Sequence, residues 1–203
     1  MPIVYILTLF LSFILIKHVL HFKKLFMQNF GMSGTYKNQF REGVGMVLVN
    51  KDNKVFAGKR TAINAKMVSW FLKKPWQMPQ GGIEPGETPL EAALRELQEE
   101  VGTKNVEVIA ETEDWLEYIV PQNLRRKGKS FVGQRQKWFL FRYLGDDRDI
   151  NLDWTNHKEF DVWRWMSVGN IIRLSVHFKR NLYLEVFKCF KEHFGDQTKD
   201  IKL

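Results

Sequence analysis

A short stretch of the chain places several carboxylates and one arginine next to a glycine-rich loop. Carboxylate oxygens are the hard ligands that magnesium and manganese prefer, and these ions also bind substrate phosphates while keeping some of their water. The combination is what a divalent metal and a pyrophosphate need in order to meet. The residues concerned are Gly81, Gly82, Glu87, Arg95, Glu96, Glu99 and Glu100.

Local signals predict that most of these residues lie on one helix. Thr88 is a good N-cap, Pro89 suits the first helical position, and Glu91 completes a capping box with Thr88. Gly102 is well placed to end the helix, because glycine readily takes the left-handed conformation found there. The apolar residues recur at helical spacing and predict one buried stripe. They are Leu90, Ala93, Leu94, Leu97 and Val101.

Three glutamates share a neighbouring face of this helix. Glu96, Glu99 and Glu100 stand three and four residues apart, so their like charges repel by roughly 0.2–0.5 kcal/mol per pair. A divalent cation on that face would reverse the sign of this effect. The alternative is an ordinary solvated acidic face. The preceding glycine loop, and an Arg95 that can reach back toward Glu87, favour the metal site.

The spacing resembles the Nudix box, which reads Gly, five residues, Glu, seven residues, Arg-Glu-Leu, one residue, Glu-Glu, one residue, Gly. In this chain the box runs from Gly81 to Thr103, and Thr103 stands where an aliphatic residue is usual. The resemblance implies a Nudix fold and metal-dependent hydrolysis of a nucleoside diphosphate that is linked to another group. Within the box, Glu87 and Arg95 are expected to be structural.

Four further segments narrow the resemblance to a subfamily. They are residues 76–83 (WQMPQGGI), 133–140 (GQRQKWFL), 159–165 (EFDVWRW) and 178–180 (FKR). This set is similar to the bacterial RNA pyrophosphohydrolases, which are close kin of plant-type diadenosine tetraphosphate hydrolases. The resemblance covers about residues 40–194, and the residues before it look unrelated to the family.

The resemblance also implies which residues hold the metal. Phosphoanhydride cleavage depends more on positioning and charge neutralisation than on covalent catalysis. The expected cofactor is Mg²⁺, for which Mn²⁺ or another divalent cation can substitute, and it would lower the pKa of a bound water. Glu99 or Glu100 is the candidate catalytic residue that orients or deprotonates this water. The expected ligands are a main-chain carbonyl at Gly81 and the carboxylates of Glu96, Glu99, Glu100 and Glu159, the last of which is otherwise a loop carboxylate.

Four positions match substrate-binding residues of the family. Arg41 and Arg60 would hold the phosphate chain, because the guanidinium fork grips phosphate in a bidentate way. Phe178 and Lys179 would stack on a purine and hold a phosphate. The alternative for this pair is core packing for Phe178 and an ordinary surface charge for Lys179.

The rest of the chain predicts strands mixed with two or three helices. Strands are expected at residues 43–50, 55–60, 106–110, 114–120, 137–144 and 162–166, the first two as a hairpin, and a helix at residues 178–194. This indicates an α/β fold, an α/β/α sandwich around a mixed β-sheet, as the resemblance also implies. Residues 61–75 are expected at the rim of the site or as an insertion without function. The basic residues within 124–129 either guide RNA or form a solvated loop.

The composition indicates one globular domain with a basic surface. The chain has 203 residues, of which 44% are hydrophobic, and a formal net charge of +8, which favours RNA, nucleotides or an anionic membrane surface as partner. We divide it into a hydrophobic extension (residues 1–38), a Nudix domain (39–194) and a polar tail (195–203). The single cysteine, Cys189, excludes an intrachain disulfide and fits a reducing cytoplasm. Its place between Phe187 and Phe190 predicts a core position on a helix.

The N-terminal extension is the anomaly of the sequence. Residues 3–16 are almost entirely apolar, but a membrane span needs about 20 residues. The positive charges follow the apolar run, whereas a secretory signal has them before it. This order would keep the domain on the cytoplasmic side of a membrane. Three readings stay open: translation begins at Met27 or Met32, residues 3–22 anchor the chain to the inner face of a membrane, or they form a peripheral amphipathic segment.

Together these features predict a metal-dependent RNA 5′ pyrophosphohydrolase in the cytoplasm. It would convert 5′-triphosphate RNA ends to 5′-monophosphates and so initiate mRNA decay. The alternative enzyme is a dinucleoside polyphosphate hydrolase, because the sequence at 76–82 is shared with that group. A third reading, a non-catalytic nucleotide- or RNA-binding module, is opposed by the presence of Glu96, Glu99 and Glu100, since degenerate domains usually lose such carboxylates.

Overall fold

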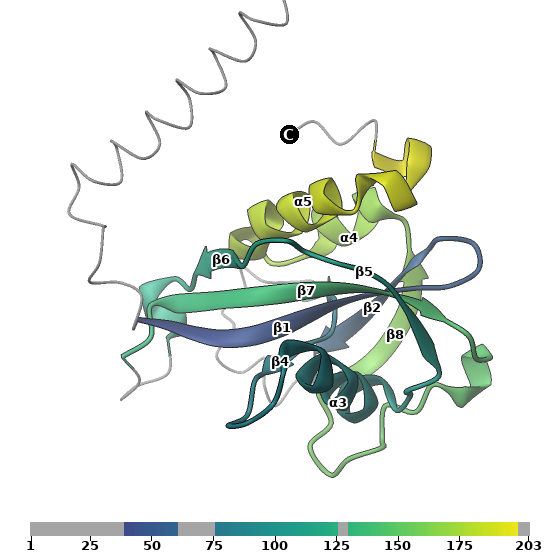
Figure 1. Cartoon of the computed structure of the whole chain (residues 1–203), viewed down its shortest axis with the longest axis horizontal. Coiled ribbons are helices and arrows are strands. Elements are labelled where there is room, and N and C mark those ends of the chain that lie inside the picture. Colours follow the sequence, from purple (N-terminus) through teal and green to yellow (C-terminus); the bar gives the residue numbers. More distant parts are fainter. Residues whose placement is uncertain (1–38, 61–75, 126–129, 199–203) are drawn as a thin grey trace, which may run out of the picture. The chain divides into compact units, whose positions relative to one another are not determined.

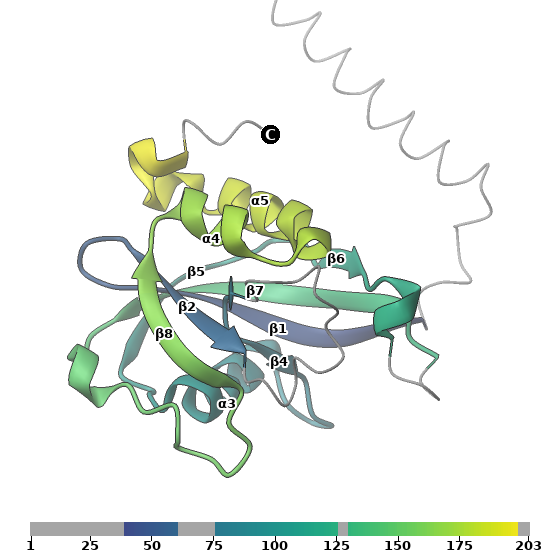
Figure 2. The same ribbon diagram turned by 180° about the vertical axis from the view of Figure 1, so that it is seen from behind.

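The computed structural model describes residues 39–60, 76–125 and 130–198, in which a mixed β-sheet lies between two layers of helix (Figure 1). Helix α3 (Pro89–Val101) covers one face of the sheet. Helices α4 (Val168–Leu174) and α5 (Arg180–Cys189) cover the other, as the view from behind also shows (Figure 2). The predicted α/β/α sandwich is therefore confirmed. The predictions for residues 1–38, 61–75 and 126–129 and for the end of the tail fall outside the described residues.

The sheet combines one parallel pair with several antiparallel pairs. Its main path runs in the order β3 (Trp76–Gln77), β2 (Val55–Arg60), β1 (Phe40–Val49), β7 (Gly133–Tyr143) and β5 (Val106–Glu111). Off this path, β4 (Gln80–Gly82) pairs with β1, β6 (Leu116–Ile119) with β7, and β8 (Phe160–Met166) with β2. Strands β1 and β7 run parallel along the whole of β1, and β1 and β2 form the predicted antiparallel hairpin.

Helix α3 begins and ends as the sequence predicts. The capping box is present, since the Thr88 hydroxyl accepts a hydrogen bond from the Glu91 N–H and the Glu91 carboxylate accepts one from the Thr88 N–H. Gly102 ends the helix with φ of 78°, and its N–H donates to the Gln98 carbonyl at 2.9 Å. A β-carbon at Gly102 would lie 2.4 Å from the carbonyl oxygen of Asn151, so glycine is required there.

Two apolar cores hold the helices against the sheet. Leu97 and Val101 of α3 pack with Phe139 of β7 on one face, and Tyr183 of α5 packs with Trp138 of β7 on the other. Full burial of one such side chain stabilises the fold by about 1.5–3 kcal/mol. The cores therefore fix α3 and α5 relative to the strands that carry the remaining candidate residues.

Three local predictions were wrong. Leu90 is exposed although the sequence places it on the buried stripe with Leu97, and Ala92 is buried instead. Cys189 is exposed, because it lies on the solvent-facing side of α5 with Glu185 and Lys188. The helix predicted at residues 178–194 is shorter, since α5 is flanked by 3₁₀ turns.

Short 3₁₀ helices connect several of the longer elements. In the described chain these are η3 (Gln122–Leu124), η4 (Asp147–Asp149), η5 (His177–Lys179), η6 (Lys191–His193) and η7 (Gly195–Thr198). No helix among the described residues has the length and apolar character that crossing a membrane requires.

Candidate active site

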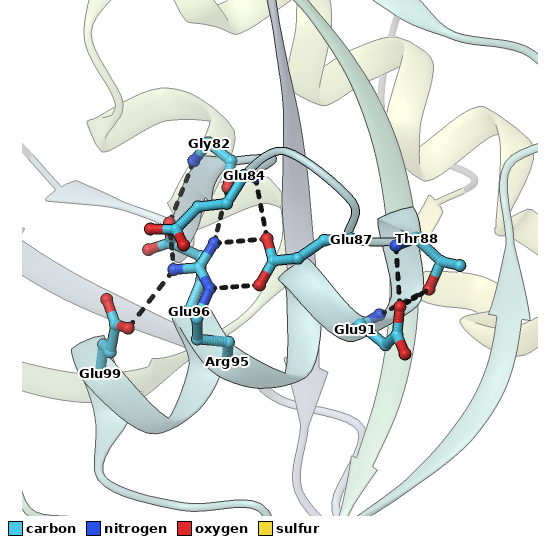
Figure 3. A network of polar contacts seen from close by, with 8 residues as sticks. All are labelled: Gly82, Glu84, Glu87, Thr88, Glu91, Arg95, Glu96 and Glu99. Carbon is cyan, nitrogen blue, oxygen red and sulfur yellow. Dashed lines mark hydrogen bonds and ion pairs between the residues drawn. The ribbon is translucent and has the colours of Figure 1, made fainter.

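Arg95 is the centre of a polar network between α3 and the loop before it (Figure 3). Its Nε and Nη2 atoms donate to the two carboxylate oxygens of Glu87 at 2.6 and 3.0 Å, and Nη2 also donates to the Gly82 carbonyl at 2.8 Å. Nη1 donates to Glu96 at 3.0 Å and to Glu99 at 3.3 Å. Arg95 thus reaches back to Glu87 as the sequence predicts. Its hydrogen bonds lower the pKa of Glu87 to about 2, which keeps this carboxylate charged at neutral pH.

Glu96 packs against Gly81 and Gly82, which the structure places in strand β4 rather than in the loop that the sequence suggested. Its Oε1 atom accepts a hydrogen bond from the Gly82 N–H at 3.0 Å, as Figure 3 shows. A β-carbon at Gly81 would lie 1.7 Å from Cδ of Glu96, so a larger residue would displace this carboxylate. Burial raises the pKa of Glu96, and the interaction with Arg95 opposes this effect. Gly81 is therefore required for the close approach of helix α3 and strand β4.

Glu99 and Glu100 are neighbours in sequence but lie in different environments. The Glu99 side chain is 44% exposed, whereas Glu100 is only 8% exposed. Oε2 of Glu100 accepts a hydrogen bond from the main-chain N–H of Gln80 at 3.0 Å. Burial raises the pKa of Glu100 well above its ordinary value, and the negative charges of Glu159 and Glu96 raise it further. Nearby positive charge would therefore be strongly favourable at Glu100.

The oxygen atoms around Glu100 suit a hard divalent cation. The predicted ligands are carboxylates and one main-chain carbonyl, which is the donor set that Mg²⁺ takes, and a cation would relieve the repulsion that Glu100 experiences. Within the described ranges, however, no three acidic, histidine or cysteine side chains converge closely enough to form a complete metal site. Water and phosphate oxygens would have to supply the remaining ligands, as is usual for Mg²⁺.

Arg60 and Glu159 form an ion pair with each other. Arg60 ends β2 and pairs in register with Phe160 at the start of β8, so strand pairing places Glu159 beside it. In the part of the chain that is described, Nε of Arg60 is buried and lacks a hydrogen-bond partner. The charges of both residues act on Glu100. A phosphate at Arg60 or a metal at Glu159 must therefore share or open this ion pair.

Arg41, near the start of β1, lies against Gly82 at the end of β4. A β-carbon at Gly82 would lie 2.1 Å from Nη2 of Arg41, so the small residue leaves space for the guanidinium. The positive charges of Arg41 and Arg60 both act on the hydroxyl of Tyr118. The two arginines predicted to hold phosphate therefore both contribute positive charge near this tyrosine.

Lys179 is buried, which excludes the alternative of an ordinary surface charge. The residue is 7% exposed, and its Nζ atom donates to Oε1 of Gln80 at 2.8 Å and to Oε1 of Gln77 at 3.3 Å. Burial lowers the pKa of Lys179 to about 7, and the positive charge of Arg60 contributes to this shift. A buried ammonium held by neutral amides gains much from an approaching anion such as a phosphate.

Tyr118 of β6 is the site residue that sequence reasoning missed. Its ring stacks on Phe178 with 6.0 Å between centroids and 26° between planes, and Nζ of Lys179 lies 5.5 Å from the Tyr118 ring centroid. Phe178 also packs against the core on this face, as the alternative reading expected, and its role in holding a purine stays a prediction. A single tyrosine in a predicted strand gives no signal of this role. Only the packing of β6 against η5 brings the two rings together.

Known proteins are similar to this chain over most of its length. A family described as "NUDIX domain" matches residues 39–186. A protein of Rickettsia prowazekii named "RNA pyrophosphohydrolase" is 47% identical over 154 residues, which are 75% of this chain and 90% of that protein. A protein of Rhodospirillum rubrum with the same name is 48% identical over 151 residues, which are 72% of this chain and 84% of that protein.

Solved structures share the fold at low sequence identity. The E. coli dihydroneopterin triphosphate pyrophosphohydrolase aligns with a TM-score of 0.54 at 18% identity, over 75% of this chain and 98% of that one. A binary complex of the C. elegans Ap4A hydrolase aligns with a TM-score of 0.52 at 22% identity, over 76% of this chain and 99% of that one. At such identities these two structures support the fold alone.

Proposed function

This chain belongs to the NUDIX domain family of hydrolases, and on that premise we propose that it is an RNA 5′ pyrophosphohydrolase. The observation that carries the proposal is the close similarity to relatives that bear this name, over most of the length of each. Water would attack a phosphorus atom of the 5′-triphosphate and break a phosphoanhydride bond. The products are a 5′-monophosphate RNA and pyrophosphate, or orthophosphate where the phosphates leave singly or the end is a diphosphate.

We further propose that the reaction requires a divalent cation, Mg²⁺ in the first place and Mn²⁺ as a substitute. When bound, the cation would neutralise phosphate charge and lower the pKa of a water molecule. The residues that would hold it are Glu96, Glu99, Glu100 and Glu159 with the main-chain carbonyl of Gly81. Arg95 holds Glu96 and Glu99 in place, and the Gln80 N–H holds Glu100. This fixed arrangement supports the assignment of the ligands.

The remaining residues would bind the substrate and orient the water. Glu99 or Glu100 would accept or direct the proton of the attacking water. Arg41, Arg60 and Lys179 would hold phosphate oxygens, since three positive charges lie around Tyr118 and Glu100. The first base would stack against the aromatic pair of Tyr118 and Phe178, which is how proteins usually hold an unpaired base.

The biological setting is also part of the proposal. A 5′-monophosphate end exposes a transcript to nucleases that prefer it, so the reaction would initiate mRNA decay in the cytoplasm. The second candidate is hydrolysis of dinucleoside polyphosphates, which the sequence at residues 76–82 favours equally. Both candidate reactions would use the same carboxylates. They differ in the substrate that the nucleotide-binding part of the site accepts, which is an RNA 5′ end in one and a dinucleoside polyphosphate in the other.

The direct test is product analysis with 5′-triphosphorylated RNA and Mg²⁺. We expect 5′-monophosphate RNA and released pyrophosphate or orthophosphate, with no reaction when EDTA replaces the metal. An unchanged 5′-triphosphate end in the presence of Mg²⁺, with a correctly folded protein, would contradict the proposal.

A further inference from the structure

Gln80 joins the two halves of the candidate site. It is the first residue of β4, directly before Gly81 and Gly82, and four hydrogen bonds connect it to Glu100, Tyr183, Gln136 and Lys179. Glu100 belongs to the carboxylate half of the site, and Lys179 belongs to the half that holds the nucleotide. Within the described residues these bonds form a continuous polar path between α3 and η5.

The chemistry of the partners fixes the orientation of the Gln80 amide. Lys179 can only donate hydrogen bonds, so the Gln80 carbonyl oxygen has to face its Nζ atom, at 2.8 Å. The amide Nε2 then faces the hydroxyl of Tyr183 and donates to it at 3.2 Å. The same hydroxyl also accepts the main-chain N–H of Met78 at 3.0 Å, and Tyr183 is fully buried. Tyr183 is therefore held in place, and it holds the Gln80 amide in turn.

Gln80 uses different atoms toward the two halves of the site. Its main-chain N–H holds the Glu100 carboxylate, whereas its side-chain carbonyl holds the Lys179 ammonium. A change of side chain therefore removes the contact with Lys179 and leaves the donor for Glu100 in place. This separation allows the two effects to be distinguished in kinetics.

We propose that Gln80 is a positioning residue that sets Lys179 relative to Glu100, and that Tyr183 acts through Gln80 by fixing its amide. The proposal rests on the proposed function, because it assumes that Lys179 contacts the substrate. The carboxylates act at the scissile phosphate, so their spacing from Lys179 determines how the bound nucleotide meets the attacking water. A shift of Lys179 would weaken substrate binding before it affects the chemistry of the bound complex.

Gln80→Met tests the first part in the full chain. The flexible methionine side chain fills a similar volume and lacks the carbonyl acceptor. We expect KM for 5′-triphosphorylated RNA to rise roughly tenfold to a hundredfold, as for loss of one hydrogen bond to a charged group, with kcat changed by less than about threefold. A fall in kcat by roughly tenfold to a hundredfold at unchanged KM would overturn the proposal, because it would place Gln80 at the chemical step. Values of kcat and KM that both equal those of the wild type would also overturn it.

Tyr183→Phe tests the second part, and Tyr143→Phe is its matched control. The Tyr143 hydroxyl donates to the main-chain carbonyl of Asp146, away from the site, so this control loses a comparable hydrogen bond. We expect Tyr183→Phe to raise KM in the wild-type background. In the Gln80→Met background it should raise KM by less than about a further twofold, since the effects of coupled residues are not additive. Full additivity, or an equal effect of Tyr143→Phe, would overturn the role of Tyr183.

The proposal can fail separately from the proposed function. If the wild-type chain hydrolyses neither triphosphorylated RNA nor diadenosine tetraphosphate, the proposed function fails. Urea unfolding of the same four proteins (wild type, both single variants and the double variant) still decides whether Tyr183 holds Gln80. A coupling between the two changes supports that contact, and additive changes in unfolding free energy contradict it.

Discussion

Arg60 and Glu159 form an ion pair that joins the end of β2 to the residue before β8. The sequence resemblance implies phosphate binding for Arg60 and metal binding for Glu159, yet the two side chains contact each other. Their charges also act in opposite directions on Glu100, since Glu159 raises the pKa of Glu100 and Arg60 lowers it. The pair therefore couples the substrate-holding and metal-holding parts of the proposed site.

Glu159→Gln separates the two roles of Glu159. If Glu159 is a metal ligand, the Mg²⁺ concentration needed for half-maximal activity should rise by roughly tenfold or more. Arg60→Gln should instead raise KM for the substrate, because it removes a phosphate contact. It should not raise the Mg²⁺ requirement, because it also releases Glu159 from its ion pair with Arg60. Both quantities come from initial rates measured across a Mg²⁺ titration. If both variants raise KM and neither raises the Mg²⁺ requirement, Glu159 serves only to hold Arg60.

Glu99→Gln and Glu100→Gln test the carboxylates of α3. Each change keeps the shape of the side chain and removes its charge, so we expect kcat to fall by roughly 10²-fold to 10⁴-fold for the residue that acts on the water. Glu107→Gln is the control, since Glu107 is an exposed glutamate on β5. Turnover within about twofold of wild type in both α3 variants would contradict the assignment of these ligands.

Tyr118 and Phe178 should act on substrate binding. Replacing Phe178 by leucine removes the stack on Tyr118, and stacking of a base on an aromatic ring contributes roughly 1–3 kcal/mol. We therefore expect KM for a purine-ended substrate to rise about fivefold to 150-fold with little change in kcat. Circular dichroism and thermal unfolding show whether the variant folds, because Phe178 also packs against the core. An unchanged KM in a folded variant would exclude the ring from base binding.

The pair of Glu87 and Arg95 predicts a pH dependence of stability. The hydrogen bond from Arg95 lowers the pKa of Glu87 from 4.5 to about 2 in the folded protein. The stability that this pair contributes is therefore fully present above pH 4.5 and is lost as the pH falls toward 2. The Tm difference between wild type and Glu87→Gln should shrink across this window.

Glu84→Gln is the control for this measurement, because Glu84 is an exposed glutamate of the same loop. A pH-dependent change that both variants share would not arise from the contact with Arg95. A Tm difference for Glu87→Gln that stays constant from neutral pH to pH 2 would contradict the account.

Local signals in the sequence were enough to predict helix α3, but not the contacts between residues that are far apart in the sequence. The N-cap, the capping box and the final glycine act within a few residues, so Thr88, Glu91 and Gly102 are readable without a fold. The Tyr118–Phe178 stack and the Arg60–Glu159 pair depend on which strands become neighbours.

Burial was the other quantity that the sequence did not reveal. A lysine is usually exposed, and no neighbouring residue in the sequence indicates that Lys179 is buried with two glutamine side chains as hydrogen-bond partners. Conversely, Cys189 lies between aromatic residues in the sequence and yet is exposed, because it falls on the solvent-facing side of α5.

The most direct test of the central claim compares two substrates on the same preparation of the full chain. Values of kcat/KM are measured with Mg²⁺ for 5′-triphosphorylated RNA and for diadenosine tetraphosphate. The account predicts a value at least about tenfold higher for the RNA, equivalent to about 1.4 kcal/mol of transition-state binding, with 5′-monophosphate RNA as product. A preference of the same size for the dinucleotide would contradict it and assign the chain to dinucleoside polyphosphate hydrolysis.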